Sequence, residues 1–507
     1  MDIRASAQFL GGVADGDNLT GSCILLQIAI AKARYRFLVD AGLIQCRFRE
    51  VLERNLRILQ ELDPTSIDAI ILTHGHIDHS GRLPLLVKNG FDGRIYCTKE
   101  TARLLPIMLE DNAKIQSHEA IFRNKRIREA RRKESPCDRR RFKDRPKSRP
   151  SLLSQPLYTI KHVQQTCQLV KLGGYDYEDW IRLKKEVFLK FYPSGHVLGG
   201  AICVIKVKGR RQTLHLGFAG DLGRADGIIL PPPKFIKEPL NHWFTESTYG
   251  GRTHPQREQE ISRLLEVVRS AAAKKGKVII PSFALERTQE IVYLLSKHMD
   301  RGDIPRIPIF LDSPMATKIT AVFSESWHSP GLFRGQDDLS FNPFCPERNP
   351  WLKLVTSPED SSALLDADGP YIVVAGSGMC DAGRVRGHLR RNLAKKETTV
   401  CLVGYMTEGS LGRKIKERWP LVRMNGEEIS VKADIVVFES FSAHADGDFL
   451  CEYAKKAFDN SRETLDKVFL LHGEKKGALD LKVELMQTLE MDGSKVVIPK
   501  NGDIFAL

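Results

Sequence analysis

The sequence has no apolar run that approaches the roughly 20 residues needed by a membrane-spanning helix, although 42% of its residues are hydrophobic. Its opening residues, MDIRASAQFLGG, lack the basic and then apolar pattern of a secretory signal. Its ten cysteines are scattered singly and form no C-x-x-C pair, which excludes the usual spacing of a disulfide framework or a thiolate zinc site. We therefore expect a cytoplasmic protein, without membrane partners, whose cysteines are reduced and mostly buried.

No short internal repeat is visible, and the 507 residues exceed the roughly 250 to 300 that one hydrophobic core serves. Apolar runs of strand length alternate with helical segments, which predicts an α/β architecture with at least two cores. The first strands are predicted at 23–29, 35–40, 69–74, 94–98, 187–192, 201–207 and 213–221. A second, parallel set is predicted at 242–248, 277–283, 308–313, 371–378 and 398–405, with helices at about 255–274 and 286–299.

Three consecutive prolines at 231–233 can continue neither a helix nor a central strand, so they mark the best candidate for a domain boundary. We predict a first domain over residues 1–230, with a basic insertion at about 118–150. A second domain is predicted over residues 231–420, and residues 421–507 are expected to return to the first domain.

Positive charge is in excess, and it is concentrated in one stretch. The formal net charge is +14, and residues 123–149 hold 14 Lys and Arg against 4 Asp and Glu, a net +10. A basic tract gains affinity for nucleic acid by releasing counterions from the phosphate backbone. The alternative is a solvated, partly disordered surface insertion. The sequence favours neither over the other.

Residues 72–81, LTHGHIDHSG, place three histidines and one aspartate within six positions directly after an apolar run. His74, His76, Asp78 and His79 offer imidazole and carboxylate groups, which suit zinc. Alternation along a tight loop lets successive side chains reach two different ions. We therefore predict two Zn²⁺ per chain, although manganese or iron would suit the same ligand types.

Four side chains cannot complete two metal sites, so further ligands must come from other strand ends. Three residues have a suitable setting: His196 in PSGHVLGG, Asp221 in FAGDLG and His472 in LLHGE. A small residue flanks each one, as expected where backbone approaches a crowded site. Alone, each would more often be structural, but together with the 74–79 loop they are predicted ligands.

The order H-x-H-x-D-H, then SGH, then GD resembles the metallo-β-lactamase superfamily. The downstream motifs TESTYG (245–250), SFSAHAD (440–446) and LLHGE (470–474) look like those of its β-CASP nucleases. That group includes the RNA-cutting subunit of pre-mRNA cleavage and polyadenylation and its prokaryotic relatives. The resemblance covers almost the whole chain and implies an αββα sandwich with an inserted β-CASP α/β cap domain.

Carried over residue by residue, the resemblance implies two zinc sites with Asp221 bridging them. Asp40 matches the family's first acidic motif, and it is implied to orient ligands or the loop rather than to bind metal. The implied ligands of one ion are His74, His76 and His196, and those of the other are Asp78, His79 and His472.

Glu246 and His444 match the acid pair of the family. A histidine at position 444 is associated there with RNA substrates, whereas the DNA-repair branch departs from it. Two ions can activate a shared water as hydroxide and neutralise phosphoryl oxygens, while His444 protonates the leaving oxygen and Glu246 orients its ring. Together with the ligand Asp78, these residues form the predicted catalytic set of a ribonuclease that acts in RNA processing or decay, as an endonuclease, a 5′-exonuclease or both.

Two glycine-rich segments, GSGMCDAGR and EGSLGR, are candidates for binding substrate phosphates. Ser377, Arg384, Ser410 and Arg413 would supply hydroxyl and guanidinium groups. Ordinary helix-entry turns in an α/β domain explain the same segments equally well.

Three other functions share parts of this pattern. A DNA nuclease would use the same chemistry, and only His444 argues clearly against it. A small-molecule metallo-hydrolase would share the metal motifs but would not need the long insert or the Glu246 and His444 pair. A binding-only subunit would have lost ligands, and none is missing here. The expected partner is RNA, most simply single-stranded, and a homodimer is left open.

Overall fold

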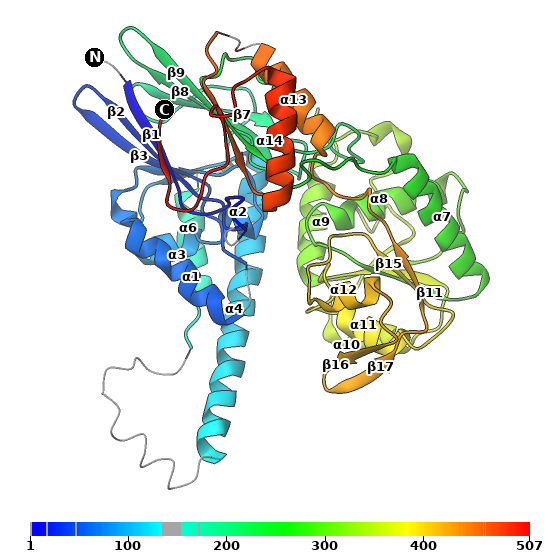
Figure 1. Cartoon of the computed structure of the whole chain (residues 1–507). Helices are drawn as coiled ribbons and strands as arrows, with labels where there is room; N and C mark the ends of the chain where they lie inside the picture. The colour runs from blue at the N-terminus through cyan, green and yellow to red at the C-terminus, as the bar shows by residue number, and fades with distance from the viewer. Residues whose placement is uncertain are drawn as a thin grey trace. The chain divides into compact units, whose positions relative to one another are not determined.

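The computed structural model describes residues 3–16, 19–45, 48–133, 154–170, 173–459, 461 and 463–507. The chain divides into two compact units. The first comprises Met1–Tyr175, Lys208–Thr213 and Pro499–Leu507, and the second comprises Asp176–Val207 and Leu214–Ile498. Both units contain sheets and helices, as the α/β prediction requires (Figure 1).

The first unit is built on a six-stranded sheet of order β21-β1-β2-β3-β4-β5. Antiparallel pairing joins β21, β1, β2 and β3, and parallel pairing joins β3, β4 and β5. Alternating apolar residues in β1 and β2 give each strand a buried face. The strands are Ile3–Phe9 (β1), Ile24–Ile30 (β2), Ala33–Val39 (β3), Ala69–Ile71 (β4), Arg94–Tyr96 (β5) and Ile504–Ala506 (β21).

Helices bury one face of this sheet in a core that includes Leu38, Ile70 and Ile95. Leucines at helical spacing in Leu83–Lys88 direct that helix into the core. The helices are Phe48–Glu61 (α1), Ile77–Ser80 (α2), Leu83–Lys88 (α3), Lys99–Lys133 (α4) and Ile160–Leu169 (α6), with a 3₁₀ turn at Pro64–Ser66 (η1).

The basic stretch begins inside helix α4, the long cyan helix of Figure 1. The residues from Arg123 to Lys133 are helical, and Lys125, Arg126 and Arg128 are exposed. Residues 134–149, the remainder of the predicted basic stretch, lie outside the described residues.

The second unit contains a seven-stranded sheet of order β20-β19-β10-β9-β8-β7-β6. Strands β9, β10, β19 and β20 pair in parallel, so their carboxyl ends meet at one edge. Its core includes Trp243 and Tyr453. The elements are Ile181–Arg182 (β6), Val187–Pro193 (β7), Ala201–Lys208 (β8), Thr213–Phe218 (β9), His242–Glu246 (β10), Lys467–Leu471 (β19), Val496–Val497 (β20), Gly447–Asp459 (α13) and Lys475–Leu489 (α14).

A third sheet, also in the second unit, has the order β13-β12-β14-β11-β15-β18. Every pair in it is parallel, as predicted for the second strand set, and β11, β12, β14 and β15 are rich in buried β-branched and leucine side chains. The prediction was wrong for the strand at 242–248, which became β10 and pairs with β9 and β19 in the seven-stranded sheet. The strands are Lys277–Pro281 (β11), Ile309–Asp312 (β12), Leu352–Leu354 (β13), Tyr371–Ala375 (β14), Thr399–Leu402 (β15) and Asp434–Val437 (β18).

Helices follow most strands of the third sheet (Figure 1). Serine caps begin three of them, because Ser313, Ser357 and Ser410 each accept a hydrogen bond from a backbone amide of the first turn. The remaining elements are Arg257–Ala273 (α7), Arg287–Asp300 (α8), Pro314–Ser326 (α9), Gln336–Asp338 (η2), Pro358–Asp366 (α10), Val385–Asn392 (α11), Leu411–Lys416 (α12), and the hairpin of Leu421–Met424 (β16) and Glu427–Ser430 (β17).

The third sheet extends past the boundary predicted between residues 420 and 421. Strand β18 pairs in parallel with β15, from Thr399 with Asp434 to Leu402 with Val437. Hydrogen bonding therefore keeps residues up to Val437 with this sheet, and β19 joins the seven-stranded sheet. Sequence alone could not place this change, because both segments are short apolar strands.

Among the described residues, no helix has both the length and the apolar character to cross a membrane. The eight described cysteines are all free thiols, and five of them are buried.

Candidate metal centre and active site

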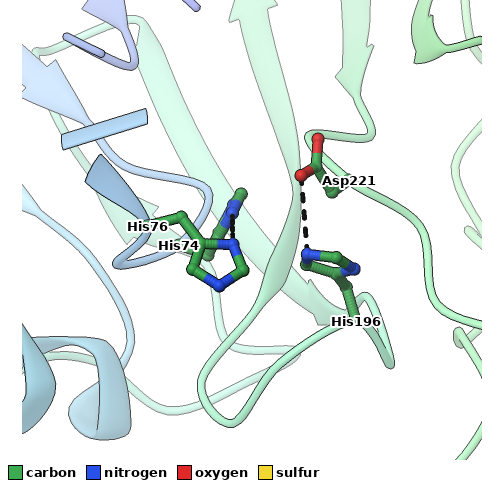
Figure 2. A group of neighbouring side chains, drawn as sticks. All are labelled: His74, His76, His196 and Asp221. Atoms are coloured by element: carbon green, nitrogen blue, oxygen red, sulfur yellow. Dashed lines mark hydrogen bonds and ion pairs between the residues drawn. The ribbon is translucent and has the colours of Figure 1, made fainter. Parts of the chain in front are cut away.

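The histidine-rich segment of the first unit leaves β4 and turns into helix α2. His74 and His79 are almost fully buried, at 1% exposure each. His74 Nε2 and His76 Nδ1 lie 3.0 Å apart (Figure 2). The rings of His74 and His79 are also adjacent, with centroids 4.1 Å apart. Imidazoles gathered with their nitrogens facing one another are arranged as metal ligands are.

Asp40, at the end of β3, holds this segment in place. Its carboxylate accepts hydrogen bonds from the backbone N–H and the hydroxyl of Thr73, both at 2.8 Å. Its Oδ2 also lies 2.7 Å from His79 Nδ1. A carboxylate that fixes one ring nitrogen sets the orientation of the other, which is the role predicted for Asp40.

Gly42, which ends the segment VDAG at residues 39–42, lies where no side chain would fit. A Cβ at Gly42 would lie only 1.6 Å from the carbonyl oxygen of Asp78. Only glycine lets the two backbones approach this closely. The loop after β3 therefore lies directly against the backbone of Asp78.

The second unit brings together residues from four strand ends of one sheet. Asp221 follows β9 and His472 follows β19, while His196 follows β7. His196 Nε2 lies 3.5 Å from Asp221 Oδ2 (Figure 2), and His472 Nδ1 lies 3.6 Å from Asp221 Oδ1. The two oxygens of one buried carboxylate thus face two different histidines.

Glu246, the fourth of these residues, is paired with His444. His444 Nδ1 lies 2.9 Å and 3.1 Å from the two carboxylate oxygens of Glu246. Glu246 is buried and also accepts a 2.6 Å hydrogen bond from the backbone N–H of Leu222. Ligand atoms of Asp221, Glu246 and His444 all lie within 4.8 Å of one another. The predicted acid pair therefore lies beside the predicted bridging ligand.

Three residues that support the site were not predicted from the sequence. Thr73 links Asp40 to the ring of His74, 3.1 Å away, and the Thr248 hydroxyl lies 3.2 Å from His472 Nδ1. His254 Nε2 lies 3.1 Å from the backbone oxygen of His444. Burial, and then the nearby Arg224, lower the pKa of His254 to about 4. Thr73 and Thr248 adjoin predicted ligand motifs, but nothing in the sequence marks His254.

Glu286 is another residue that the sequence analysis missed. It is 2% exposed and adopts a left-handed backbone conformation, φ +70°, just before α8. Its Oε2 accepts a 3.0 Å hydrogen bond from the backbone N–H of Leu198, two residues after His196. Burial, together with the nearby Glu290, raises the pKa of Glu286 well above its usual value. A buried, strained carboxylic acid thus braces the loop of His196.

The four candidate phosphate-binding residues have different surroundings. Arg384 donates to buried Asp312 at 2.7 Å and to the Val355 carbonyl at 3.0 Å. Ser377 is bonded to Ala382, while Ser410 caps α12 by accepting from the Arg413 backbone N–H. The Arg413 guanidinium lies 2.6 Å from Glu417. Ser410 therefore fits the alternative that these segments are ordinary turns at the start of a helix.

Three family models match the chain. The metallo-beta-lactamase superfamily model matches residues 16–151, the Beta-Casp domain model matches residues 288–415, and the Zn-dependent metallo-hydrolase RNA specificity domain model matches residues 428–499. The chain is also 32% identical over 490 residues to Ribonuclease TTHA0252 of Thermus thermophilus, a match that covers 96% of each protein. The chain belongs to the β-CASP ribonucleases.

Two further relatives are similar over most of the chain. Transcription termination factor FttA of Methanocaldococcus jannaschii is 28% identical over 488 residues, which cover 94% of this chain and 68% of that protein. FttA of Thermococcus kodakarensis is 29% identical over 457 residues, 88% of this chain and 63% of that protein. The fold predicted from the motifs, a metallo-β-lactamase fold with an inserted β-CASP domain, is confirmed. This β-CASP ribonuclease is a metal-dependent hydrolase that binds divalent metal.

Proposed function

We propose that this chain is a zinc-dependent ribonuclease that hydrolyses the phosphodiester bonds of single-stranded RNA at a pair of metal ions. The observation that carries the proposal is Asp221, whose two oxygens face His196 and His472 separately. A carboxylate with one histidine on each oxygen has the arrangement of a ligand shared between two ions.

The donor set fits zinc, because it consists of imidazoles and carboxylates on loops at strand ends. When bound, the two ions supply an activated water and neutralise charge on the phosphate oxygens. The residues proposed to hold one ion are His74, His76 and His196, those proposed for the other are Asp78, His79 and His472, and Asp221 is proposed to bridge them.

His444 is proposed to deliver the proton to the leaving oxygen. Its Nδ1 lies within hydrogen-bond distance of both oxygens of Glu246, and Nε2 is the nitrogen proposed to act on substrate. The carboxylate orients the ring and stabilises its protonated form. The short bond from the Leu222 N–H fixes Glu246 in turn.

RNA is the proposed substrate for two reasons. The histidine at position 444 resembles that of RNA-cutting members, and the model matching residues 428–499 is named for RNA specificity. The name of the Thermus relative, a ribonuclease, agrees with this choice. We also propose that the enzyme acts in the cytoplasm.

We also propose the domain division predicted from the sequence, with residues 1–230 and 421–507 forming the metallo-β-lactamase part and residues 231–420 the cap. The antiparallel pairing of β21 with β1 supports the return of the C-terminal end. The pairing of β18 with β15 supports placing the second boundary of this proposal nearer to Val437.

The test is cleavage of end-labelled single-stranded RNA, and of DNA of the same sequence, by zinc-loaded wild type and by Asp221→Ala. We expect wild type to cut RNA in preference to DNA and Asp221→Ala to cut neither. Trp419→Ala, an exposed residue of the second unit, serves as the control and keeps full activity. Preferential cutting of DNA would support the DNA nuclease, and a fully loaded chain that cuts neither would overturn the proposal.

A further inference from the structure

Phe283 is the one exposed residue in a buried segment. All the other residues from Pro281 to Val292 are buried, whereas Phe283 is 42% exposed. Its backbone is firmly anchored, because Thr288 donates to the Phe283 carbonyl with its hydroxyl at 2.6 Å. Large apolar side chains are normally buried when the fold permits it. The fold here holds an aromatic ring open to solvent on a rigid support.

Two glycines leave room for this ring. A Cβ at Gly378 would lie 3.0 Å from the ring carbons Cδ2 and Cε2, and a Cβ at Gly404 would lie 3.0 Å from Cε2. A side chain at either position would press on the ring, which would have to shift by a few tenths of an ångström. Phe283, Gly378 and Gly404 follow β11, β14 and β15, which are neighbours in the parallel sheet. The carboxyl edge of such a sheet is where ligands generally bind.

A second exposed aromatic residue follows Gly404 directly. Tyr405 is 54% exposed, and its hydroxyl donates to Glu474 Oε1 at 3.3 Å. Glu474 lies two residues after His472, so Tyr405 connects the third sheet to the segment of a proposed metal ligand. Arg252 and Arg413 also act electrostatically on Tyr405, after the larger influence of Glu474, and they pair with Glu474 and Glu417 respectively. An exposed ring with guanidinium groups near it suits a ligand that combines flat bases with phosphates.

We propose that Phe283 and Tyr405 form a stacking surface for unpaired RNA bases, which rests on the proposed function and specifies how its substrate is held. Aromatic side chains bind single strands through the flat faces of bases, largely without regard to sequence. The stacking surface lies outside residues 428–499, the segment matched by the RNA specificity model. It therefore adds a base-contacting element to the phosphate chemistry of the metal centre.

The experiment measures the affinity of the zinc-loaded full chain for a fluorescein-labelled RNA of about 12 nucleotides, long enough to span such a site. Phosphorothioate linkages slow its hydrolysis during the measurement. We expect Phe283→Ala and Tyr405→Ala each to weaken binding by roughly 5- to 100-fold, the range for loss of one stacked base. Phe283→Trp restores binding, and Trp419→Ala, an exposed aromatic with Lys414 over its ring, leaves it unchanged.

Abasic positions in the RNA provide the second arm. If Phe283 stacks on a base, removing that base from the RNA weakens its binding to wild type. The same removal leaves binding to Phe283→Ala unchanged, because the stacking contact is already lost. If Phe283→Ala binds RNA as tightly as wild type does, the proposal is overturned. If that variant also changes the oligomeric state, Phe283 belongs to a protein interface instead. RNA that is bound through Phe283 but never cut would uphold the stacking surface and overturn only the ribonuclease function.

Discussion

His444 lies against Glu246 and beside Asp221, yet its proposed role is to move a proton and not to hold metal. His444→Ala should therefore retain the metal content of wild type. Its RNA cleavage should fall by about 10²- to 10⁴-fold, the usual contribution of a positioned general acid. The measurement combines the single-turnover rate of RNA cleavage with the metal content of the same sample. Loss of metal in this variant would assign His444 to the ligands instead.

Glu286 leads to a prediction about pH. A carboxyl whose folded pKa is raised keeps its proton in the folded state, so it destabilises the fold progressively as pH rises above about 4.5, the usual pKa of glutamate. Glutamine has the same shape and no such penalty, and it can still accept from the Leu198 N–H. The melting temperature of Glu286→Gln should thus rise relative to wild type between pH 5 and pH 8, given as rough limits of the window.

Two further variants test this reading of Glu286. Glu286→Ala should be less stable than Glu286→Gln by about 1 to 3 kcal/mol, because the buried Leu198 N–H would lose its partner. Glu258→Gln, an exposed glutamate on α7, serves as the control. A pH-independent difference between wild type and Glu286→Gln would mean that Glu286 is ionised in the fold.

Helix α4 presents Lys125, Arg126 and Arg128 on its exposed surface. If this part of the helix contacts RNA phosphates, replacing all three by Gln should lower affinity and reduce the dependence of binding on salt. The slope of log K against log salt should become shallower by roughly 0.7 for each lost contact with a single strand. Glutamine preserves the helix. Binding titrations over a series of salt concentrations make the measurement.

The matched control replaces Lys208, Arg210 and Arg211 at the turn between β8 and β9, which are also exposed. Equal effects of the two triple variants would show only the general influence of net charge. An unchanged slope for the α4 variant would favour the solvated surface over a role in RNA binding.

Most strands and the motif loops could be predicted because local sequence determines them. The apolar run 187–192 became Val187–Pro193, and the helix expected near 286–299 became Arg287–Asp300. Predicted strands that included site residues ended earlier, as β9 ends at Phe218 before Gly220 turns the chain at φ +57°. Asp221 therefore lies in a loop, where a ligand can turn towards an ion.

The features that could not be predicted depend on contacts between distant residues. Glu286 meets Leu198 across 88 positions, and nothing local marks either residue. The extension of α4 into the basic stretch was also unexpected, since like charges at helical spacing oppose helix formation. The place of β18 depends on its pairing with β15, which local periodicity does not encode.

At the level of the whole molecule, metal binding should stabilise the folded chain, because the proposed ligands lie far apart in the sequence and only folding brings ligands of this kind together. A metal ion that binds only the folded chain stabilises it by about 2.7 kcal/mol per site when the free metal concentration is 100 times the Kd. Removal of metal by a chelator should lower the melting temperature and abolish RNA cleavage, and added zinc should restore both. If the chelator abolishes cleavage but leaves the melting temperature unchanged, metal binding does not stabilise the fold.

The most direct test of the metal centre is native mass spectrometry of the intact chain after loading with zinc. Two Zn²⁺ per chain are expected for wild type and for His444→Ala, and fewer for Asp221→Ala, since Asp221 is proposed to bridge the pair. Wild type that binds a single ion at saturation, or Asp221→Ala that still holds two, would contradict the two-metal account.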